Sequence, residues 1–525
     1  MTDHSNGGAA VVETLAAHGV DTIFGIPGTH NLELYRHFGA NGVRAVTPRH
    51  EQGAGYAAEA YARVSGRPGV VITTSGPGLT NAMTAAATAY AESQPVLLVS
   101  SGMPTGAEGR DLGQLHEAKN VTGAMDQLIA WSRRVGSADE AAAAVTEAFS
   151  GFTGRRPRPV HIEVPVDVLE QAWTGEPRIA AATTPPAADR DAVRRVAEVL
   201  SAAERPLVIA GGGAVDAQTE VTAIAEALGA PVATTVNGKG TVDESHPLSV
   251  GASIRLRALQ KAASDSDALL VVGTELGDSD LWEGRIRGRT VIRCDIDPAQ
   301  LNKNCPSDHA LLGDSAATLA ALFDALPTKP GGGEQRAAEL RSACRDEAAA
   351  DAGVYAEINA AVRAALPAEA ALAGDSSQVT YFGSVHYFDV PAPRRFCYSP
   401  GFATLGYGLP AGLGAAIGRP GAPVAVLLGD GAFMFSVQEL TTLVEQQLSV
   451  PVIVVDSGGY REIQDQEAAR GIPPIGVKLR TPDFAALAVA MGANGVRTTS
   501  AADLTELVGA ALTADGPTLI HLDIR

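Results

Sequence analysis

Two polar–glycine turns, about two dozen residues apart, are the part of this 525-residue chain with the residue types for metal and phosphate chemistry. Gly429–Gly431 (GDG) follows the apolar run Val424–Leu428, and Asp456–Gly459 (DSGG) follows the apolar run Val450–Val455. A carboxylate, a second oxygen ligand and bare backbone amides suit Mg²⁺ bound to a diphosphate. This chemistry requires that the two turns meet in space.

The elements around the turns are predicted to bring them together. Both apolar runs are short, rich in β-branched residues and bounded by turn signals, which indicates buried strands. Between them, Ser436–Leu448 carries apolar residues at helical spacing. A strand–helix–strand unit of this length closes as a right-handed crossover between parallel strands. Both carboxyl ends then lie on one edge of the sheet, where open α/β sheets bind ligands.

Charge and composition narrow the possible functions. The net charge of −19 is spread along the chain, which argues against nucleic acid or anionic membranes as partners. The N-terminus lacks a basic segment followed by an apolar run, and no apolar stretch reaches the ~18 residues of a membrane span. Cys294, Cys305, Cys344 and Cys397 lack CxxC spacing, so we expect neither a disulfide nor a zinc framework. We expect a soluble, cytoplasmic protein.

Helices and strands alternate along the whole chain, which predicts an α/β protein of three doubly wound parallel-sheet domains. Linkers rich in Pro, Gly and Ala are predicted at Ala180–Ala188 and Pro327–Gln335. The predicted domains are therefore residues 1–180, 189–326 and 337–525, the last opening with an alanine-rich helical stretch. Strands are predicted at Thr22–Gly25, Gly69–Thr74, Pro95–Ser101, Pro206–Gly211, Pro231–Thr235, Ala268–Val272 and Thr290–Asp295.

Three glycine-rich motifs of the first domain carry a family resemblance. FGIPG (from Phe24), RHEQGAGYAAEAYAR (from Arg49) and TSGPGLTNA (from Thr74) resemble the pyrimidine-binding domain of thiamine diphosphate (ThDP) enzymes of the acetolactate synthase and 2-oxo acid decarboxylase group. The two polar–glycine turns resemble the motif that anchors the cofactor in these enzymes, which usually ends in Asn-Asn. Here that pair is Asp456-Ser457. The resemblance covers nearly the whole chain and implies ThDP and Mg²⁺ as cofactors. It makes the three domains pyrimidine-binding, central and diphosphate-binding.

The resemblance also implies a ligand set. The metal would bind the Asp430 carboxylate, the Ser457 side chain and the Gly459 carbonyl. Because serine is shorter than asparagine, either a water intervenes or Asp456 takes its place. The implied cofactor contacts are Pro27, Gly28, Glu51, Ser75, Asn81, Ser376, Ser377, Ala403, Leu405, Gly429, Asp430, Gly431, Ala432, Ser457, Gly459 and Tyr460.

Glu51, His116 and Leu405 are the implied catalytic residues. Glu51 would hydrogen-bond N1′ of the aminopyrimidine, and a carboxylic acid sharing a proton there promotes the imino tautomer. The alternative is that Glu51 stabilises a helix N-terminus. Leu405 would hold ThDP bent, which brings its reacting atoms together, and the Ala403 carbonyl would accept from the 4′-amino group.

Substrate contacts are expected from two loops. Acetolactate synthases carry Phe-Gln where this chain has Leu115-His116, and histidine can hydrogen-bond a reacting carboxylate or carbonyl near neutral pH. The alternative is a structural loop histidine. Glu117 and His30 are further candidates.

The second loop, Asp278–Glu283, follows a predicted strand of the central domain. Asp278, Asp280, Trp282 and Glu283 would either bind a cationic substrate tail or form a solvated loop. The rest of the central domain is expected to be structural, because no persuasive GxGxxG is present.

Within the family, the chain looks most like 5-guanidino-2-oxopentanoate decarboxylases, on the strength of FGIPGTHNLELYRHF (Phe24–Phe38), LHE (Leu115–Glu117), GTELGDSD (from Gly273) and GYREI (from Gly459). The implied reaction is ThDP- and Mg²⁺-dependent decarboxylation of a 2-oxo acid through a C2 carbanion and an enamine, giving an aldehyde. The alternatives are an acetolactate synthase-like carboligase and a non-catalytic ThDP-binding homologue, the latter because of Ser457. A nucleotide-binding oxidoreductase could also use doubly wound domains, but we find no good glycine fingerprint followed by an acid about twenty residues on. The resemblance also implies a homo-oligomer, at least a dimer and commonly a tetramer, with active sites between the first domain of one subunit and the third of another.

Overall fold

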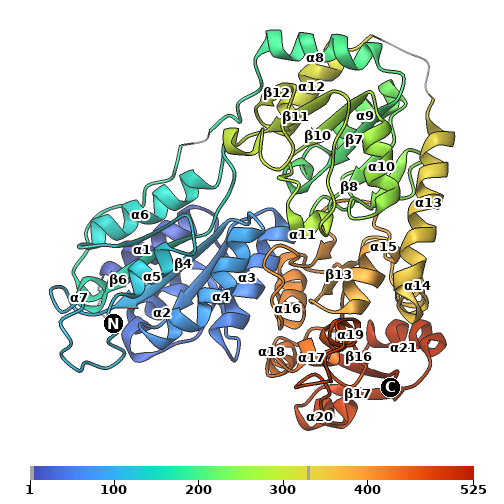
Figure 1. The fold of residues 1–525 in the computed structure, drawn as a ribbon. Coiled ribbons are helices and arrows are strands. Elements are labelled where there is room, and N and C mark those ends of the chain that lie inside the picture. Colours follow the sequence, from blue (N-terminus) through green and yellow to red (C-terminus); the bar gives the residue numbers. More distant parts are fainter. Residues whose placement is uncertain (1–4, 182, 328–331) are drawn as a thin grey trace.

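Three six-stranded parallel sheets form the framework of the molecule (Figure 1). The computed structural model describes residues 5–181, 183–327 and 332–525. Helices pack against the sheets, which confirms the prediction of three doubly wound α/β domains. Both predicted linkers contain residues outside the described ranges, Ala182 in one and 328–331 in the other. The domain limits therefore stay a prediction.

The first sheet has the strand order β2-β1-β3-β4-β6-β5. Its strands are β1 (Thr22–Gly25), β2 (Arg44–Val46), β3 (Gly69–Thr73), β4 (Val96–Gly102), β5 (Trp131–Arg134) and β6 (Val160–Pro165). Its helices are α1 (Gly7–Ala17), α2 (Leu32–Phe38), α3 (Glu51–Ser65), α4 (Pro77–Ala91), α5 (Val121–Asp126), α6 (Ala138–Gly151) and α7 (Val166–Glu170).

The third sheet repeats this connectivity in the order β14-β13-β15-β16-β18-β17. Its strands are β13 (Ala371–Gly374), β14 (Phe396–Cys397), β15 (Val424–Gly429), β16 (Pro451–Asp456), β17 (Asn494–Thr498) and β18 (Thr518–Asp523). Its helices are α14 (Val354–Ala365), α15 (Val385–Tyr387), α16 (Gly408–Gly418), α17 (Asp430–Phe433), α18 (Glu439–Glu445), α19 (Arg461–Ala469), α20 (Phe484–Ala490) and α21 (Leu504–Ala511).

The middle sheet has a different order, β12-β11-β10-β7-β8-β9. The strand order reverses between β10 and β7, which creates a switch point at their carboxyl ends. Its strands are β7 (Pro206–Ala210), β8 (Val232–Thr234), β9 (Ser249–Ala252), β10 (Ala268–Val272), β11 (Val291–Asp295) and β12 (His309–Leu312). Its helices are α8 (Arg190–Ala202), α9 (Gln218–Leu228), α10 (Arg257–Asp265), α11 (Asp278–Leu281) and α12 (Ser315–Ala325), and α13 (Glu334–Ala352) leads to the third domain.

The first and third domains share one hydrophobic core through α3 and α16. A Cβ at Gly414 would lie 2.0 Å from the Ala57 carbonyl oxygen, so the two helices approach each other closely where glycine allows it. Beside them, Tyr56 and Tyr407 pack edge to face with ring centroids 5.5 Å apart. The two domains of one chain are therefore fixed to each other by buried apolar contact.

The predicted elements differ from the observed ones mainly in the helices. The predicted helix over Ser436–Leu448 is the shorter α18, preceded by the separate turn α17 that begins at Asp430. The alanine-rich stretch before the third sheet is two helices, because Gly353 adopts φ +48° and ends the first one. All four cysteines are buried and free. Within the described ranges, no helix is both long and apolar enough to cross a membrane.

Candidate active site

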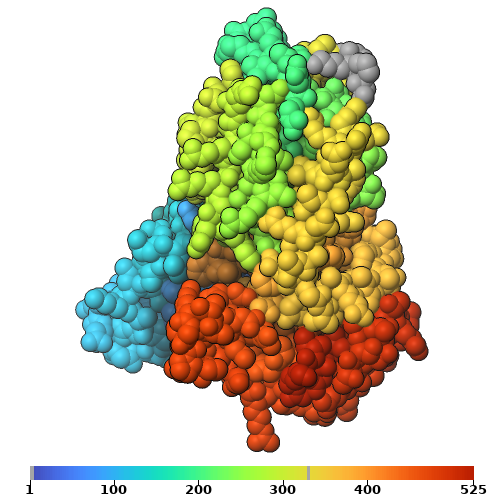
Figure 2. All heavy atoms as spheres, turned by 45° about the vertical axis from the view of Figure 1, so that its right-hand side comes forward, coloured from blue at the N-terminus to red at the C-terminus, as the bar shows by residue number. Residues whose placement is uncertain are grey.

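A cavity of about 1150 Å³ lies where the three domains meet, and a hollow between them is visible in the space-filling view (Figure 2). The carboxyl end of the third sheet forms one wall, and the loop after β10 forms another. The predicted site residues that line this cavity are Asp280, Ser376, Ser377, Ala403, Leu405, Gly429, Asp430, Gly431, Ala432, Ser457, Gly459 and Tyr460. We call those from the third domain, Ser376 to Tyr460, the C-terminal half-site.

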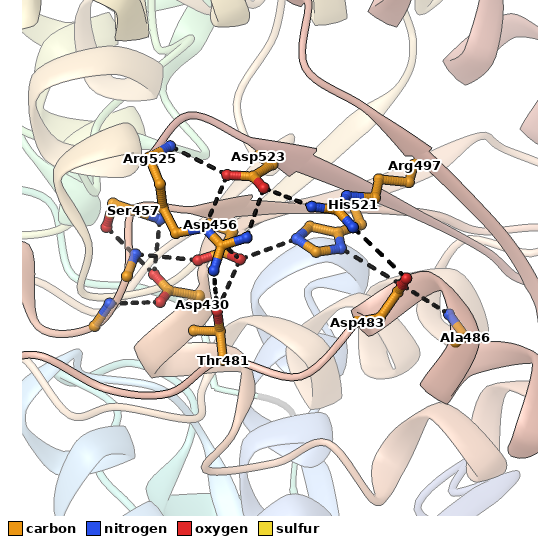
Figure 3. Close-up of polar contacts among 12 residues, drawn as sticks. Asp430, Asp456, Ser457, Thr481, Asp483, Ala486, Arg497, His521, Asp523 and Arg525 are labelled. Carbon is orange, nitrogen blue, oxygen red and sulfur yellow. Dashed lines mark hydrogen bonds and ion pairs between the residues drawn. The ribbon is translucent and has the colours of Figure 1, made fainter.

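The two polar–glycine turns meet at Asp430, as predicted. Its carboxylate follows β15 and is only 1% exposed. Oδ1 lies 3.3 Å from both the backbone nitrogen and the hydroxyl of Ser457, and Oδ2 accepts from the Gly459 nitrogen at 2.7 Å (Figure 3). Burial, with a smaller effect from the charge of Asp456, raises the pKa of Asp430 above its ordinary value. A bound cation would relieve the desolvation of this carboxylate.

Asp456 lies behind this pair, and its oxygens are already bonded. Oδ1 accepts from the Gly458 nitrogen at 3.0 Å, and Oδ2 accepts from the Thr481 hydroxyl at 2.9 Å and from His521 Nε2 at 3.0 Å (Figure 3). The carboxylate is fully buried and is not part of the cavity wall. Asp456 therefore anchors the loop, and the structure favours Ser457 over Asp456 as the second ligand.

A third acid near Asp456 belongs to an ion-pair network. Asp523, His521 and Asp456 lie close enough to hold a metal ion between them. The Asp523 carboxylate, however, accepts from Arg497 at 2.7 Å and from Arg525 at 2.6 Å, and these bonds hold its pKa well below its ordinary value. Two arginines thus already supply the positive charge that a metal would bring.

The loop that carries Ala403 and Leu405 is held by two buried acids that sequence reasoning missed. Asp375 Oδ2 accepts from the Gly408 nitrogen at 2.6 Å, and burial raises the pKa of Asp375 to about 7. Glu92, from the first domain, accepts from the Gly401 nitrogen at 2.7 Å. Asp375 directly precedes Ser376 and was detectable from that position, whereas nothing in the sequence marks Glu92, which follows the end of α4.

A second group of predicted residues lies in the first domain, away from the cavity. We call His30, Glu51, Ser75, Asn81 and His116 the N-terminal half-site. None of them is part of the cavity wall within the described chain. Asn81 is exposed, so this half-site is open at the surface of the single chain.

Glu51 is the first residue of α3, and its Oε2 accepts from Asn81 Nδ2 at 2.9 Å. A carboxylate in the first turn also interacts favourably with the helix dipole, so the structure is consistent with the helix-stabilising role, and the role of Glu51 toward the aminopyrimidine stays a prediction. The preceding loop is fixed by buried Glu439 of the third domain, which accepts from the backbone nitrogens of Arg49 and His50 at 3.0–3.1 Å.

Two histidines of this half-site share one serine hydroxyl. Ser75 Oγ lies 2.6 Å from His30 Nδ1 and 3.3 Å from His116 Nδ1, and the two rings are 5.3 Å apart. Burial and, secondarily, the charge of His116 lower the pKa of His30. The hydroxyl can donate to one ring while it accepts from the other, so a proton can pass between them.

The remaining predicted residues have more local contacts. The Glu117 carboxylate accepts from the nitrogens of Leu112 and Gln114 in its own loop, which lowers its pKa. Leu115 is 62% exposed, and Pro27 is exposed next to Gly28. The structure thus gives Glu117 a loop-holding contact, and the substrate roles of Glu117 and Leu115 stay predictions.

Comparison with known proteins identifies the family. Models of the thiamine pyrophosphate enzyme family match the N-terminal TPP-binding domain over residues 5–128, the central domain over 193–322 and the C-terminal TPP-binding domain over 375–522. The chain belongs to the thiamine pyrophosphate (ThDP) enzyme family. It is therefore an enzyme whose cofactors are ThDP and a divalent metal, typically Mg²⁺.

Individual relatives span almost the full chain. A probable 2-ketoarginine decarboxylase of Pseudomonas aeruginosa is 40% identical, with 98% of this chain and 93% of that protein covered. The acetolactate synthase large subunit of Parasynechococcus marenigrum is 32% identical, with 99% and 88% covered. Acetolactate synthase isozyme 2 of Escherichia coli, large subunit, is also 32% identical, with 99% and 95% covered.

The C-terminal half-site fits these cofactors by its chemistry. Asp430 and Ser457 offer a carboxylate and a hydroxyl oxygen, the ligand type that Mg²⁺ prefers. The Ser376 hydroxyl lines the cavity and is buried with no hydrogen-bond partner among the described residues, as a group awaiting a ligand would be. A Cβ at Gly431 would lie 2.8 Å from the Tyr460 ring, so the bare backbone is required there.

Proposed function

We propose that this protein uses ThDP and Mg²⁺ to decarboxylate a 2-oxo acid to an aldehyde, with a substrate of the 5-guanidino-2-oxopentanoate type. The observation that carries the proposal is the Asp430–Ser457 oxygen pair at one end of a cavity that also has room for a substrate. The name of the relative from Pseudomonas aeruginosa supports both the reaction and the substrate class.

When bound, ThDP supplies the nucleophilic carbon and the electron sink that decarboxylation needs. In this proposal, Asp430, Ser457 and the Gly459 carbonyl hold the metal, and the Ser376 hydroxyl and the glycine turns bind the diphosphate. Leu405 and Ala403, fixed by Asp375 and Glu92, shape the cofactor seat. Glu51 holds a proton on its carboxyl group for the aminopyrimidine.

His30, Ser75 and His116 act as the proton source that ends the reaction as an aldehyde. Their shared hydrogen bonds let a proton move from one ring through the Ser75 hydroxyl to the other. Formation of the aldehyde adds one proton to carbon after carbon dioxide leaves, and an imidazole side chain is a common proton donor for such a step.

The proposal requires a second copy of the chain. The N-terminal half-site lies outside the cavity of its own chain, so the first domain of a partner would complete each active site. Large apolar side chains are exposed on the loops of both half-sites: Leu112 and Leu115 on one, Phe402 and Phe435 on the other. Burial of such residues would drive association, and we propose a dimer as the minimal unit and a tetramer as the assembly.

Calorimetric titration of the apo-protein with ThDP, with and without Mg²⁺, tests the cofactor site. Carbon dioxide release from a set of 2-oxo acids, with product analysis, then tests the reaction. ThDP binding that depends on Mg²⁺, followed by aldehyde formation, would support the proposal. A ThDP affinity that is the same with and without Mg²⁺ would contradict it. An acetolactate-type product would instead favour the carboligase alternative, which the acetolactate synthase relatives support.

A further inference from the structure

One wall of the cavity is a loop of the middle domain that has an unusual backbone conformation. Leu276, Trp282 and Glu283 all have φ between +46° and +64°, a region that residues with side chains seldom adopt. Such conformations are strained and cluster at functional sites. The loop follows β10, one of the two strands at the switch point of the middle sheet.

Asp280 on this wall has a carboxylate without a partner. It is partly buried and lines the cavity, and among the residues that the structure describes no group donates to it. Burial, with smaller effects from Glu92 and Glu275, raises the pKa of Asp280 to about 7. At pH 7 this carboxyl group is therefore about half protonated, and a bound cation would favour its ionised form.

The arginines of the cavity wall form ion pairs with acids other than Asp280. The two arginines that line it, Arg255 and Arg461, pair with Asp351 at 3.2 Å and with Asp465 at 3.0 Å. Glu275, which also lines the cavity, is by contrast neutralised by Lys303 at 2.7 Å. A cation that enters the cavity would therefore meet a carboxylate that these arginines do not pair with.

An aromatic surface beside Asp280 suits a planar cation. Trp282 is 44% exposed, and Tyr381 and Phe382 pack edge-on against it at 5.8 and 5.7 Å. The guanidinium of Arg255 already lies over this ring at 4.6 Å from its centroid. The indole thus accepts a guanidinium in this very environment, and part of its surface remains open.

We propose that Asp280, with Trp282 on the same loop, is the specificity site that binds the guanidinium tail of the substrate, in the cavity that Asp430 also lines. A planar guanidinium can donate two parallel hydrogen bonds to one carboxylate, a geometry that an ammonium cannot match. This inference rests on the proposed function, since it assigns the substrate's tail to residues of the same cavity.

The direct test compares two substrates in two variants. Asp280→Asn keeps the size of the side chain and removes the charge, and Asp324→Asn makes the same change at an exposed position of the middle domain, outside the cavity wall. On 5-guanidino-2-oxopentanoate, we expect kcat/KM to fall at least about thirtyfold in Asp280→Asn, because a buried charged partner is lost. On the neutral 2-oxohexanoate it should change by less than about threefold, as should Asp324→Asn on either substrate. Equal losses on both substrates, or no loss, would overturn the assignment.

A binding measurement separates this inference from the proposed function. Titration of the apo-protein with butylguanidinium, against the neutral butylurea, needs no turnover. We expect butylguanidinium to bind and butylurea not to bind. Binding of the cation at pH 7 should release a proton from Asp280, which titrations in buffers of different ionisation enthalpy measure. Binding should be at least about tenfold weaker in Asp280→Asn. If the wild-type protein binds butylguanidinium and butylurea with equal affinity, the guanidinium site at Asp280 is refuted. This outcome does not depend on whether Asp280→Asn folds. Cation binding without carbon dioxide release from any 2-oxo acid would refute the decarboxylase alone.

Discussion

The two half-sites come from sheets of identical connectivity, yet one is enclosed and the other is open. Asp430 is 1% exposed at the wall of a cavity, whereas Glu51 and Asn81 bond to each other at the surface of the first domain. The cavity of the single chain contains the proposed metal and diphosphate groups and the proposed tail site. The proposed proton-transfer residues of the N-terminal half-site do not line this cavity in the described chain. A single chain therefore carries both sets of proposed residues but does not bring them into one cavity.

The core explains why the two halves of one chain do not face each other. Helices α3 and α16 fix the first and third domains in a single hydrophobic core. Glu439 of the third domain bonds the loop directly before Glu51, so each half-site is rigidly held. A hinge motion that closed Glu51 onto Asp430 within one chain would have to break this packing, which favours completion by a second copy.

The largest expected effect is at the enclosed half. Asp430→Ala should weaken Mg²⁺-dependent ThDP binding by at least about a hundredfold, because even partners outside the direct ligand set contribute ten- to a hundredfold. Titration calorimetry measures this change, with Asp278→Asn as the control for loss of one acid from the same cavity. Undiminished thermal stabilisation of Asp430→Ala by ThDP plus Mg²⁺ would remove Asp430 from the ligand set.

A variant of the N-terminal half-site should bind the cofactor normally and still lose turnover. Glu51→Gln should leave ThDP affinity within about threefold of wild type and reduce turnover by roughly a hundredfold or more, as loss of a proton-transfer group does. Glu170→Gln is the matched control, since it makes the same change at an exposed position of the same domain outside the half-site. Wild-type H/D exchange at the C2 position of ThDP in Glu51→Gln would disprove the role of Glu51.

A mixture of the Glu51→Gln and Asp430→Ala variants tests whether the two half-sites of one active site come from different chains. If each active site takes one half from each chain, Glu51→Gln and Asp430→Ala subunits that are allowed to exchange should regain about a quarter of wild-type activity, because half the dimers are hybrids with one intact site. Each variant alone, taken through the same exchange, is the control. A mixture as inactive as its components would place both halves in one chain.

A smaller effect is expected at Ser457. Ser457→Ala should weaken Mg²⁺ affinity by roughly tenfold, and Ser457→Asn should bind Mg²⁺ at least as tightly as wild type, because the amide oxygen reaches further. Titration of the ThDP-saturated protein with Mg²⁺ gives both values. Wild-type affinity in Ser457→Ala would mean that a water or the backbone, rather than this hydroxyl, completes the site.

The smallest effect concerns the pKa of His30. Burial lowers the pKa of His30, and the charge of the neighbouring His116 lowers it further. His116→Gln should therefore raise the pKa of His30 without restoring its ordinary value, because the burial remains. NMR titration of the His30 ring measures the shift, with His246→Gln as a distant control. A pKa that stays constant or falls would show that the two rings are not coupled.

The strand limits and the meeting of the two polar–glycine turns could be predicted from the sequence, because both depend on residues close together in the chain. The limits of β1 and β10 match the predicted strands, since short β-branched runs bounded by turn residues specify buried strands. The meeting of Asp430 with Ser457 followed from the parallel strand–helix–strand unit, whose geometry fixes where carboxyl ends lie. Helix ends were predicted less well, as at α18, because turns within a few residues depend on packing.

By itself, the sequence determined the three-domain α/β architecture, the family and the residue types of both half-sites, because strand periodicity and glycine turns act over short distances. Only the tertiary structure decided that Asp456 faces away from the cavity and that Glu92 and Asp375 hold the Leu405 loop. It also left the Asp280 carboxylate, on the wall of the cavity, without a partner among the residues that the structure describes. Each of these depends on contacts between residues far apart in the chain, and burial changes the energetics of a carboxylate in a way that no local pattern records.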